Sequence, residues 1–180
     1  MIIVAHNAGV EQENLPLSLD VEFRSENRFV RVYVQGAPVG DILSDNSHEE
    51  DFFRYHDVFH FANAMVLGWS PCTRKLLGRK RRSSAYIDEI EDGGRASIVE
   101  EAVVSIMHKY VRGKIKLQGA IEVIKILVEG YEPERFCDKD WKQVIDLASK
   151  IYPVLIKNKG GRVVGDRLSR TLYLLNPEAI

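Results

Sequence analysis

The chain has 180 residues, of which 45% are hydrophobic and 28% are charged, and its formal net charge is −1. This length suits one domain with a hydrophobic core, and the composition is that of an ordinary globular protein. A net charge so close to zero gives no overall attraction to nucleic acid or to a membrane surface, so we expect neither as a partner.

The sequence also indicates where the protein works. Residues 1–14 lack the basic region and the long apolar run of a signal peptide. No segment approaches the roughly 18 apolar residues that a membrane span needs. Two cysteines, Cys72 and Cys137, are too few for a disulfide framework or a zinc cluster. We therefore expect a cytoplasmic protein in a reducing compartment.

Strand patterns lie at both ends of the chain. Residues 17–40 form an N-terminal β segment, because they contain two β-branched, alternating runs that are typical of a hairpin. Residues 160–175 predict a second, closing hairpin. The stretch before the first hairpin, residues 1–16, is expected to be a short strand or an arm.

Between the hairpins, residues 49–158 predict a helical core. Apolar periodicity and terminal Gly or Pro residues indicate helices over 52–69, a short segment from Pro71, 88–110, 115–129 and 138–158. The whole chain is therefore predicted to be a single α+β domain over residues 1–180. Its main part would be a bundle of about four or five helices, with small antiparallel hairpins from the N- and C-terminal segments.

Residues 52–69 carry the first candidate for a functional site. They are long enough for about five helical turns and have apolar residues on all sides, as in a buried helix. At about 100° per residue, His56, His60 and Asn63 nevertheless fall on one stripe, and Asp57 lies on its flank. Such polar side chains are costly in a buried helix unless they are paired or bind a ligand.

The helix predicted over residues 88–110 provides a facing acidic cluster. Its apolar stripe comprises Ile98, Val99, Ala102, Val103, Ile106 and Tyr110, and projecting this stripe backward reaches Asp88, Glu91, Asp92 and Arg95. Glu100 and Glu101 lie on either side of the stripe and could join the cluster by a modest rotation of the helix. The pair Gly93-Gly94 costs about 2 kcal/mol of helix propensity relative to alanine and favours a break at that point.

Carboxylates and imidazoles on facing helices are the usual donors of a metal site in a helical bundle. The expected metal ligands are His56, Asp57, His60, Glu89, Glu91 and Asp92. Oxygen ligands favour Mg²⁺ or Mn²⁺, and Mg²⁺ also bridges substrate phosphates. The two histidines additionally allow Zn²⁺, Fe²⁺ or Ni²⁺.

A basic run separates the two helices, with six Lys or Arg side chains between Arg74 and Arg82. The expected phosphate contacts are Arg79, Lys80, Arg82 and Arg95. A metal beside a basic loop predicts hydrolysis of a phosphate ester or phosphoanhydride. The expected catalytic carboxylates are Asp57 and Glu101, which would position or deprotonate the attacking water.

Simpler interpretations stay open for each of these features. His56 and His60 can be hydrogen-bonded core histidines. The basic run can be a solvated loop, balanced by the acidic run through surface ion pairs worth ~0–1 kcal/mol each. The Cys72 thiol has no obvious base partner and is interpreted as a packing residue.

Several motifs within residues 40–110 together resemble a known family. They are GDILSDN at 40–46, YHDVFH at 55–60, LGWSP at 67–71, RKR at 79–81, DEIEDGGRA at 88–96, and Glu100-Glu101. This pattern resembles the C-terminal domain attached to certain MazG-like nucleotide pyrophosphohydrolases, and the resemblance covers residues 17–175.

The resemblance implies an activity on nucleotides. MazG enzymes are all-α proteins that cleave nucleoside triphosphates to monophosphate and pyrophosphate, using Mg²⁺ held by an ExxE…ExxD pattern. The segment Glu89-Ile-Glu-Asp92 matches the ExxD half, whereas Asp57-Val-Phe-His60 stands where ExxE is expected. The resemblance therefore implies a metal-dependent enzyme that acts on a nucleoside triphosphate or a related nucleotide.

Two other functions stay open. One is a non-catalytic nucleotide-sensing or partner-binding module, such as a component of phage defence. The other is an HD-like metal phosphohydrolase, which rests on the dipeptide His56-Asp57 and would release products other than pyrophosphate. A homodimer is also open, because the flanking strands offer edges for pairing.

Overall fold

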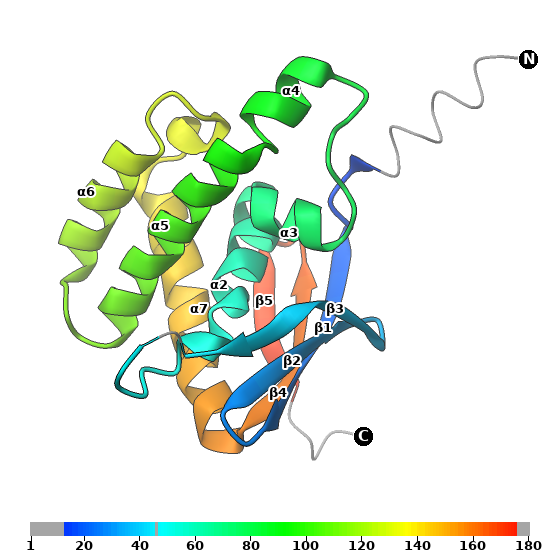
Figure 1. Ribbon diagram of the computed structural model, residues 1–180. Coiled ribbons are helices and arrows are strands. Elements are labelled where there is room, and N and C mark those ends of the chain that lie inside the picture. The colour runs from blue at the N-terminus through cyan, green and yellow to red at the C-terminus, as the bar shows by residue number, and fades with distance from the viewer. Residues whose placement is uncertain (1–12, 46, 176–180) are drawn as a thin grey trace, which may run out of the picture.

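The computed structural model describes residues 13–45 and 47–175 (Figure 1). Most of the arm predicted for residues 1–16 lies outside this part of the chain. A five-stranded antiparallel sheet has the strand order β3-β2-β1-β4-β5. The strands are β1 (Ser18–Glu26), β2 (Phe29–Val34), β3 (Ala37–Ser44), β4 (Gly160–Asp166) and β5 (Thr171–Leu175).

The predicted fold class, a mainly helical bundle with small hairpins at its ends, is wrong. Both hairpins are present, but β1 pairs with β2 along one edge and with β4 along the other, so they form one central sheet. Val21 is opposite both Val34 and Val163. The backbone groups of β1 are therefore paired at both edges, and its alternate residues Leu19, Val21 and Phe23 are buried in the core.

Strand β3 was not predicted, because Pro38 and Gly40 indicate a break in the pattern. It lies at the edge of the sheet, where a missing backbone donor is tolerated. Gly40 has a φ of +63°, and a Cβ atom at this position would lie 2.7 Å from Leu76 Cδ1. The close approach brings β3 against the helix that carries Leu76.

The helices gather on one side of the sheet (Figure 1). They are α2 (Asp57–Ala62), α3 (Pro71–Leu76), α4 (Ala85–Ile90), α5 (Gly94–Val111), α6 (Leu117–Leu127) and α7 (Asp138–Asn158), with shorter segments η1 (Phe53–Tyr55), η2 (Asn63–Leu67) and η3 (Glu132–Arg135). The bounds of α7 agree with the prediction, and its predicted inward residues from Trp141 to Leu155 are buried. Within the described residues, none of these helices combines the length and apolar character that crossing a membrane requires.

Residues 52–69, predicted as one central helix, contain three types of helix. Segment η1 is a 3₁₀ turn, α2 is α-helical and η2 is a π-helix. Every residue from Val58 to Leu67 is buried. The predicted burial is therefore confirmed, and α2 lies between α5, α7 and the sheet (Figure 1).

The helix predicted over residues 88–110 is broken. Helix α4 ends at Ile90 and α5 begins at Gly94. A Cβ atom on Gly93 would lie 1.9 Å from the carbonyl oxygen of Glu89, so only glycine fits here. Because of this break, the acidic residues of α4 do not continue the buried face of α5.

Candidate functional site

His60 lies at the centre of a buried polar cluster. Its side chain belongs to α2 and is 3% exposed. The ring atom Nδ1 is 3.1 Å from Glu100 Oε1, and Nε2 is 3.3 Å from Glu101 Oε1. Neither contact has the geometry of a hydrogen bond within the part of the chain that the structure describes. Each ring nitrogen therefore lies near a carboxylate but makes no well-aligned hydrogen bond, and this is unfavourable for a buried polar atom.

Glu100 is the main counter-charge of His60. It is fully buried on α5 and accepts the backbone N–H of Cys72 at 2.8 Å and the side-chain amide of Asn63 at 3.1 Å. Burial alone would raise the pKa of Glu100, but the charge of His60 and the hydrogen bond from the Cys72 backbone lower it. Burial opposes protonation of His60, yet Glu100 raises the pKa of His60 well above its ordinary value.

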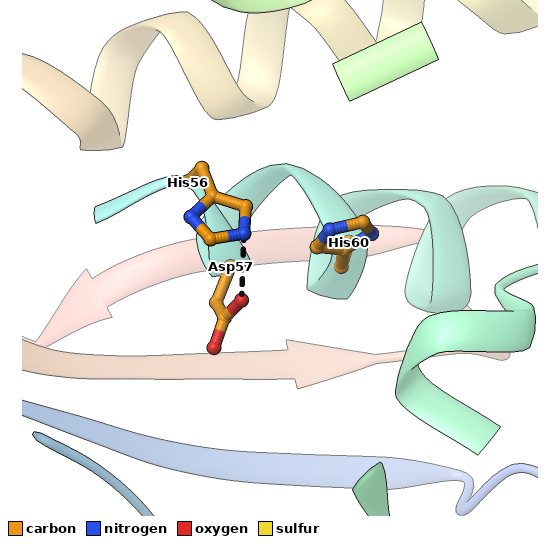
Figure 2. Close-up of side chains that lie close together, drawn as sticks. All are labelled: His56, Asp57 and His60. Carbon is orange, nitrogen blue, oxygen red and sulfur yellow. Dashed lines mark ion pairs between the residues drawn. The ribbon is translucent and has the colours of Figure 1, made fainter. Parts of the chain in front are cut away.

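His56 and Asp57 begin the same helix (Figure 2). The Nδ1 atom of His56 lies 2.8 Å from the carbonyl oxygen of Phe53 and donates to it. This bond leaves the lone pair on Nε2, which is 3.4 Å from Asp57 Oδ1. Burial lowers the pKa of His56, so its ring is neutral near pH 7. A lone pair beside a carboxylate oxygen is unfavourable unless a cation lies between them.

These residues fit a metal ion. Ligand atoms of His56, Asp57 and His60 all lie within 4.8 Å of one another, and so do those of His60, Cys72 and Glu100. A hydrogen bond from the second ring nitrogen to a backbone carbonyl, as His56 makes, is typical of metal-ligating histidine. The donors are imidazoles and carboxylates, which suit Mn²⁺, Fe²⁺, Ni²⁺ or Zn²⁺ better than Mg²⁺.

The cluster lies at one side of a pocket of about 600 Å³. The lining includes His56, Asp57, His60, Cys72 and Glu101. A larger hollow of about 1080 Å³ lies over the sheet near Asp20 and Arg162. We consider the smaller pocket the candidate site, because its described lining includes His56 and His60, whereas that of the larger hollow includes neither.

The other predicted metal ligands do not join this cluster. Glu89 is exposed on α4, and Glu91 accepts the backbone N–H of Glu132 at 3.0 Å. Asp92 is buried, but Arg81 binds it through the backbone N–H at 2.8 Å and through Nη2 at 2.6 Å. The described lining of the pocket includes none of the three.

The predicted phosphate contacts also lie elsewhere. Lys80 pairs with Asp88 at 2.6 Å, and Arg79 donates to the carbonyl oxygen of Asn14 at 3.2 Å. Arg82 and Arg95 are exposed. None of these four lines the described pocket, whereas Lys75 of α3 does.

The predicted site omitted Cys72 and Lys75, and it included Glu100 only as a residue beside the stripe that a modest rotation of the helix could bring in. A signal for Glu100 exists in α5, whose buried residues are Ala96, Glu100, Val103, Val104, Met107 and His108. This stripe is rotated from the predicted one, on which Ile98 stood and which Glu100 merely flanked. Cys72 and Lys75 reach the pocket because α3 packs against α5 and its Leu76 lies close to Gly40 of β3, and local sequence does not reveal these contacts.

The fold and the cluster define an α+β domain with an interior histidine–carboxylate site that opens into a pocket. A family model of the MazG C-terminal domain matches residues 4–178, and the chain belongs to this family. The resemblance predicted from the motifs is therefore confirmed. No curated protein and no solved structure matches the chain. The family connects the chain to MazG-like nucleotide pyrophosphohydrolases.

Proposed function

We propose that the chain is a metal-dependent nucleotide pyrophosphohydrolase-like protein of the cytoplasm. It would cleave a nucleoside triphosphate or a related nucleotide to monophosphate and pyrophosphate. The observation that carries this proposal is the convergence of His56, Asp57 and His60 on one pocket. Membership of the MazG C-terminal domain family supports the nucleotide as ligand. The two free cysteines, Cys72 and Cys137, agree with a reducing compartment.

His56, Asp57 and His60 would hold the metal, with Glu101 beside them. A divalent cation in such a site neutralises phosphate charge and lowers the pKa of water. Phe53 orients His56 through its carbonyl oxygen, and Glu100 positions His60. The expected metal is Mn²⁺, because the proposed ligands combine imidazole with carboxylate, with Zn²⁺, Fe²⁺ or Ni²⁺ as alternatives and Mg²⁺ less favoured.

Glu101 is the proposed base. Its side chain is 48% exposed, so it can reach a water molecule in the pocket. Burial raises the pKa of Glu101, but the contact with His60 outweighs this effect and lowers it. Glu101 is therefore ionised near neutral pH and can accept the proton of the attacking water. Asp57, which lines the same pocket, would help to orient this water.

The charge of the pocket makes nucleotide binding depend on metal. Asp41, Asp57 and Glu101 line it, whereas Lys75 is the one Lys or Arg side chain in its described lining. A polyphosphate alone would be repelled by this excess of negative charge. We therefore propose that the nucleotide enters as a complex with the divalent cation, and that chelation abolishes binding.

The test is a panel of nucleoside triphosphates with Mg²⁺, Mn²⁺, Zn²⁺, Fe²⁺ and Ni²⁺, scored for released pyrophosphate. We expect turnover that Asp57→Asn lowers by at least about 100-fold, as for loss of a positioned catalytic carboxylate. The matched control is Asp88→Asn, which removes a carboxylate that pairs with Lys80 outside the pocket. Failure of the folded native protein to bind any of these cations would contradict the proposal.

A second candidate is a non-catalytic nucleotide-sensing module. It is favoured by Asp92, because the carboxylate that matches the ExxD pattern is occupied by Arg81. This module would bind nucleotide without releasing pyrophosphate, and binding would survive both Asp57→Ala and Asp92→Ala. The nucleotide panel separates the two candidates, because only the enzyme yields pyrophosphate.

A further inference from the structure

The candidate pocket has two walls of opposite character. One is the polar cluster around His60. The other is apolar and consists of Leu43 from β3, Leu76 from α3 and Ile98 from α5. Ile98 is 71% exposed, although water contact with so large an aliphatic side chain is unfavourable. Three separate elements therefore bring an aliphatic side chain to the same pocket as the metal-binding donors.

We propose that this apolar wall binds the base and sugar of the nucleotide, while Lys75 contacts its phosphates beside the His56–Asp57–His60 cluster. This inference rests on the proposed function and assigns the two ends of the ligand. It gives the nucleoside a binding surface of its own, separate from the groups that hold metal and phosphate.

The size and shape of the pocket support this arrangement. A volume of about 600 Å³ lies within the range of pockets for ligands of nucleotide size. A base is planar and loses water from its apolar faces when it packs on aliphatic side chains. Leu76 packs against the hydrophobic core, and the missing Cβ of Gly40 leaves room for its Cδ1 atom. The wall is therefore formed before the ligand arrives, which lowers the entropic cost of binding.

The contributions of the two walls to binding can be measured separately with two ligands. Inorganic tripolyphosphate can use only the metal and Lys75, whereas a nucleoside triphosphate can also use the apolar wall. The measurement is calorimetric binding of tripolyphosphate and of α,β-methylene ATP, which resists cleavage, both with saturating Mn²⁺. Because it measures binding, the result does not depend on turnover.

The decisive variant is Ile98→Ser, with Ile126→Ser as its control. Both isoleucines are 71% exposed on helices, but Ile126 lies on α6 and outside the described lining of the pocket. We expect Ile98→Ser to lower the affinity for the ATP analogue by about fivefold, since it removes apolar contact with the base alone. The affinity for tripolyphosphate should not change. Ile126→Ser should change neither affinity.

The third variant is Lys75→Met, which should lower the affinity for both ligands by a similar factor. The inference is overturned if Ile98→Ser weakens both ligands equally or leaves the ATP analogue unchanged. Equal affinity of the native protein for the two ligands would also overturn it, while leaving the metal-dependent phosphate site intact. If the native protein binds neither ligand with Mn²⁺, the proposed function fails together with it.

Discussion

His60 shows how a single side chain can indicate a ligand. Its two ring nitrogens lie near two carboxylates of different exposure, the buried Glu100 and the half-exposed Glu101. The buried carboxylate fixes the charge of the ring, whereas the exposed one faces the pocket. A bound cation would compete with the proton of His60, so metal affinity should rise with pH.

Glu100→Gln tests the buried contact. The amide keeps the shape of the side chain but leaves the buried imidazolium without its counter-charge. We expect a loss of about 3–5 kcal/mol in the free energy of unfolding, as for other broken buried pairs, measured by urea denaturation. Glu101→Gln is the control, because its side chain is 48% exposed and should cost less than about 1 kcal/mol. Equal losses in the two variants would contradict this account of His60.

His108 should make stability depend on pH. Its Nε2 atom lies 3.0 Å from the carbonyl oxygen of Asp51 and 2.9 Å from the hydroxyl of Tyr152. Burial lowers the pKa of His108 below its ordinary value of 6.5, so the unfolded chain takes up the proton first. The contribution of neutral His108 to the free energy of unfolding is complete above about pH 6.5. It is lost as the pH falls through the lower pKa of His108 in the folded state.

The measurement compares urea unfolding of the native protein and of His108→Gln across this pH range. The glutamine amide can still donate to Asp51 but does not titrate. The native protein should lose more unfolding free energy than the variant between pH 7.5 and pH 5. Parallel pH profiles for the two proteins would mean that His108 does not carry this dependence.

At the scale of single elements, the break at Gly93 between α4 and α5 determines which acidic side chain faces His60. Because α4 and α5 are separate helices, the buried stripe of α5 begins at Ala96 and includes Glu100. An uninterrupted helix would have continued the buried face of α5 into the acidic residues of α4. The glycine therefore allows Asp92 to pair with Arg81 while Glu100 faces His60.

Gly93→Ala should destabilise the fold, whereas Gly94→Ala should not. A Cβ on Gly93 would lie 1.9 Å from the carbonyl oxygen of Glu89, a backbone atom that cannot move alone. We expect this variant to lose about 1–3 kcal/mol of unfolding free energy. A Cβ on Gly94 meets no atom within 4 Å, so alanine there should be neutral or stabilise by up to about 1 kcal/mol. Thermal and urea unfolding of the pair would show the contrast.

The sequence allowed part of the site to be predicted. His56, Asp57 and His60 belong to one helix, so their common face follows from helical periodicity. Glu100 could not be placed in the same way, because the rotation of α5 depends on its packing against α2, α3 and α6. Lys75 was missed because only the three-dimensional packing shows which residues of the basic run reach the pocket.

The strands illustrate the same limit for the fold. Alternation was sufficient to predict β1 and β2 as a hairpin, and the segment of β4 and β5 as another. The two hairpins pair through β1 and β4, which brings together residues 142 positions apart, such as Asp20 and Arg162. No local sequence pattern predicts this pairing. The edge strand β3 was missed because its proline and glycine are tolerated only where one side of the strand has no partner.

For the molecule as a whole, metal should act as a stabilising ligand. The proposed ligands lie on α2, and the carboxylates beside them lie on α5, so a bound cation would connect elements of the core. Mn²⁺ at about 100 times its dissociation constant should stabilise the fold by about 2.7 kcal/mol. We expect a higher Tm with Mn²⁺ that EDTA reverses and that Asp57→Asn largely removes. An identical rise in Asp57→Asn would indicate that the ion binds elsewhere.

The position of β1 at the centre of the sheet also determines the order of events during synthesis. Strands β1, β2 and β3 leave the ribosome early, but one edge of β1 has no partner until β4 has been made. Contacts between such distant segments form slowly, because a long loop must close before they give any stabilisation. The unpaired edge is meanwhile open to other chains. We therefore expect the docking of residues 160–175 on β1 to be a slow step in the folding of this domain, and to end the exposure of that edge to aggregation.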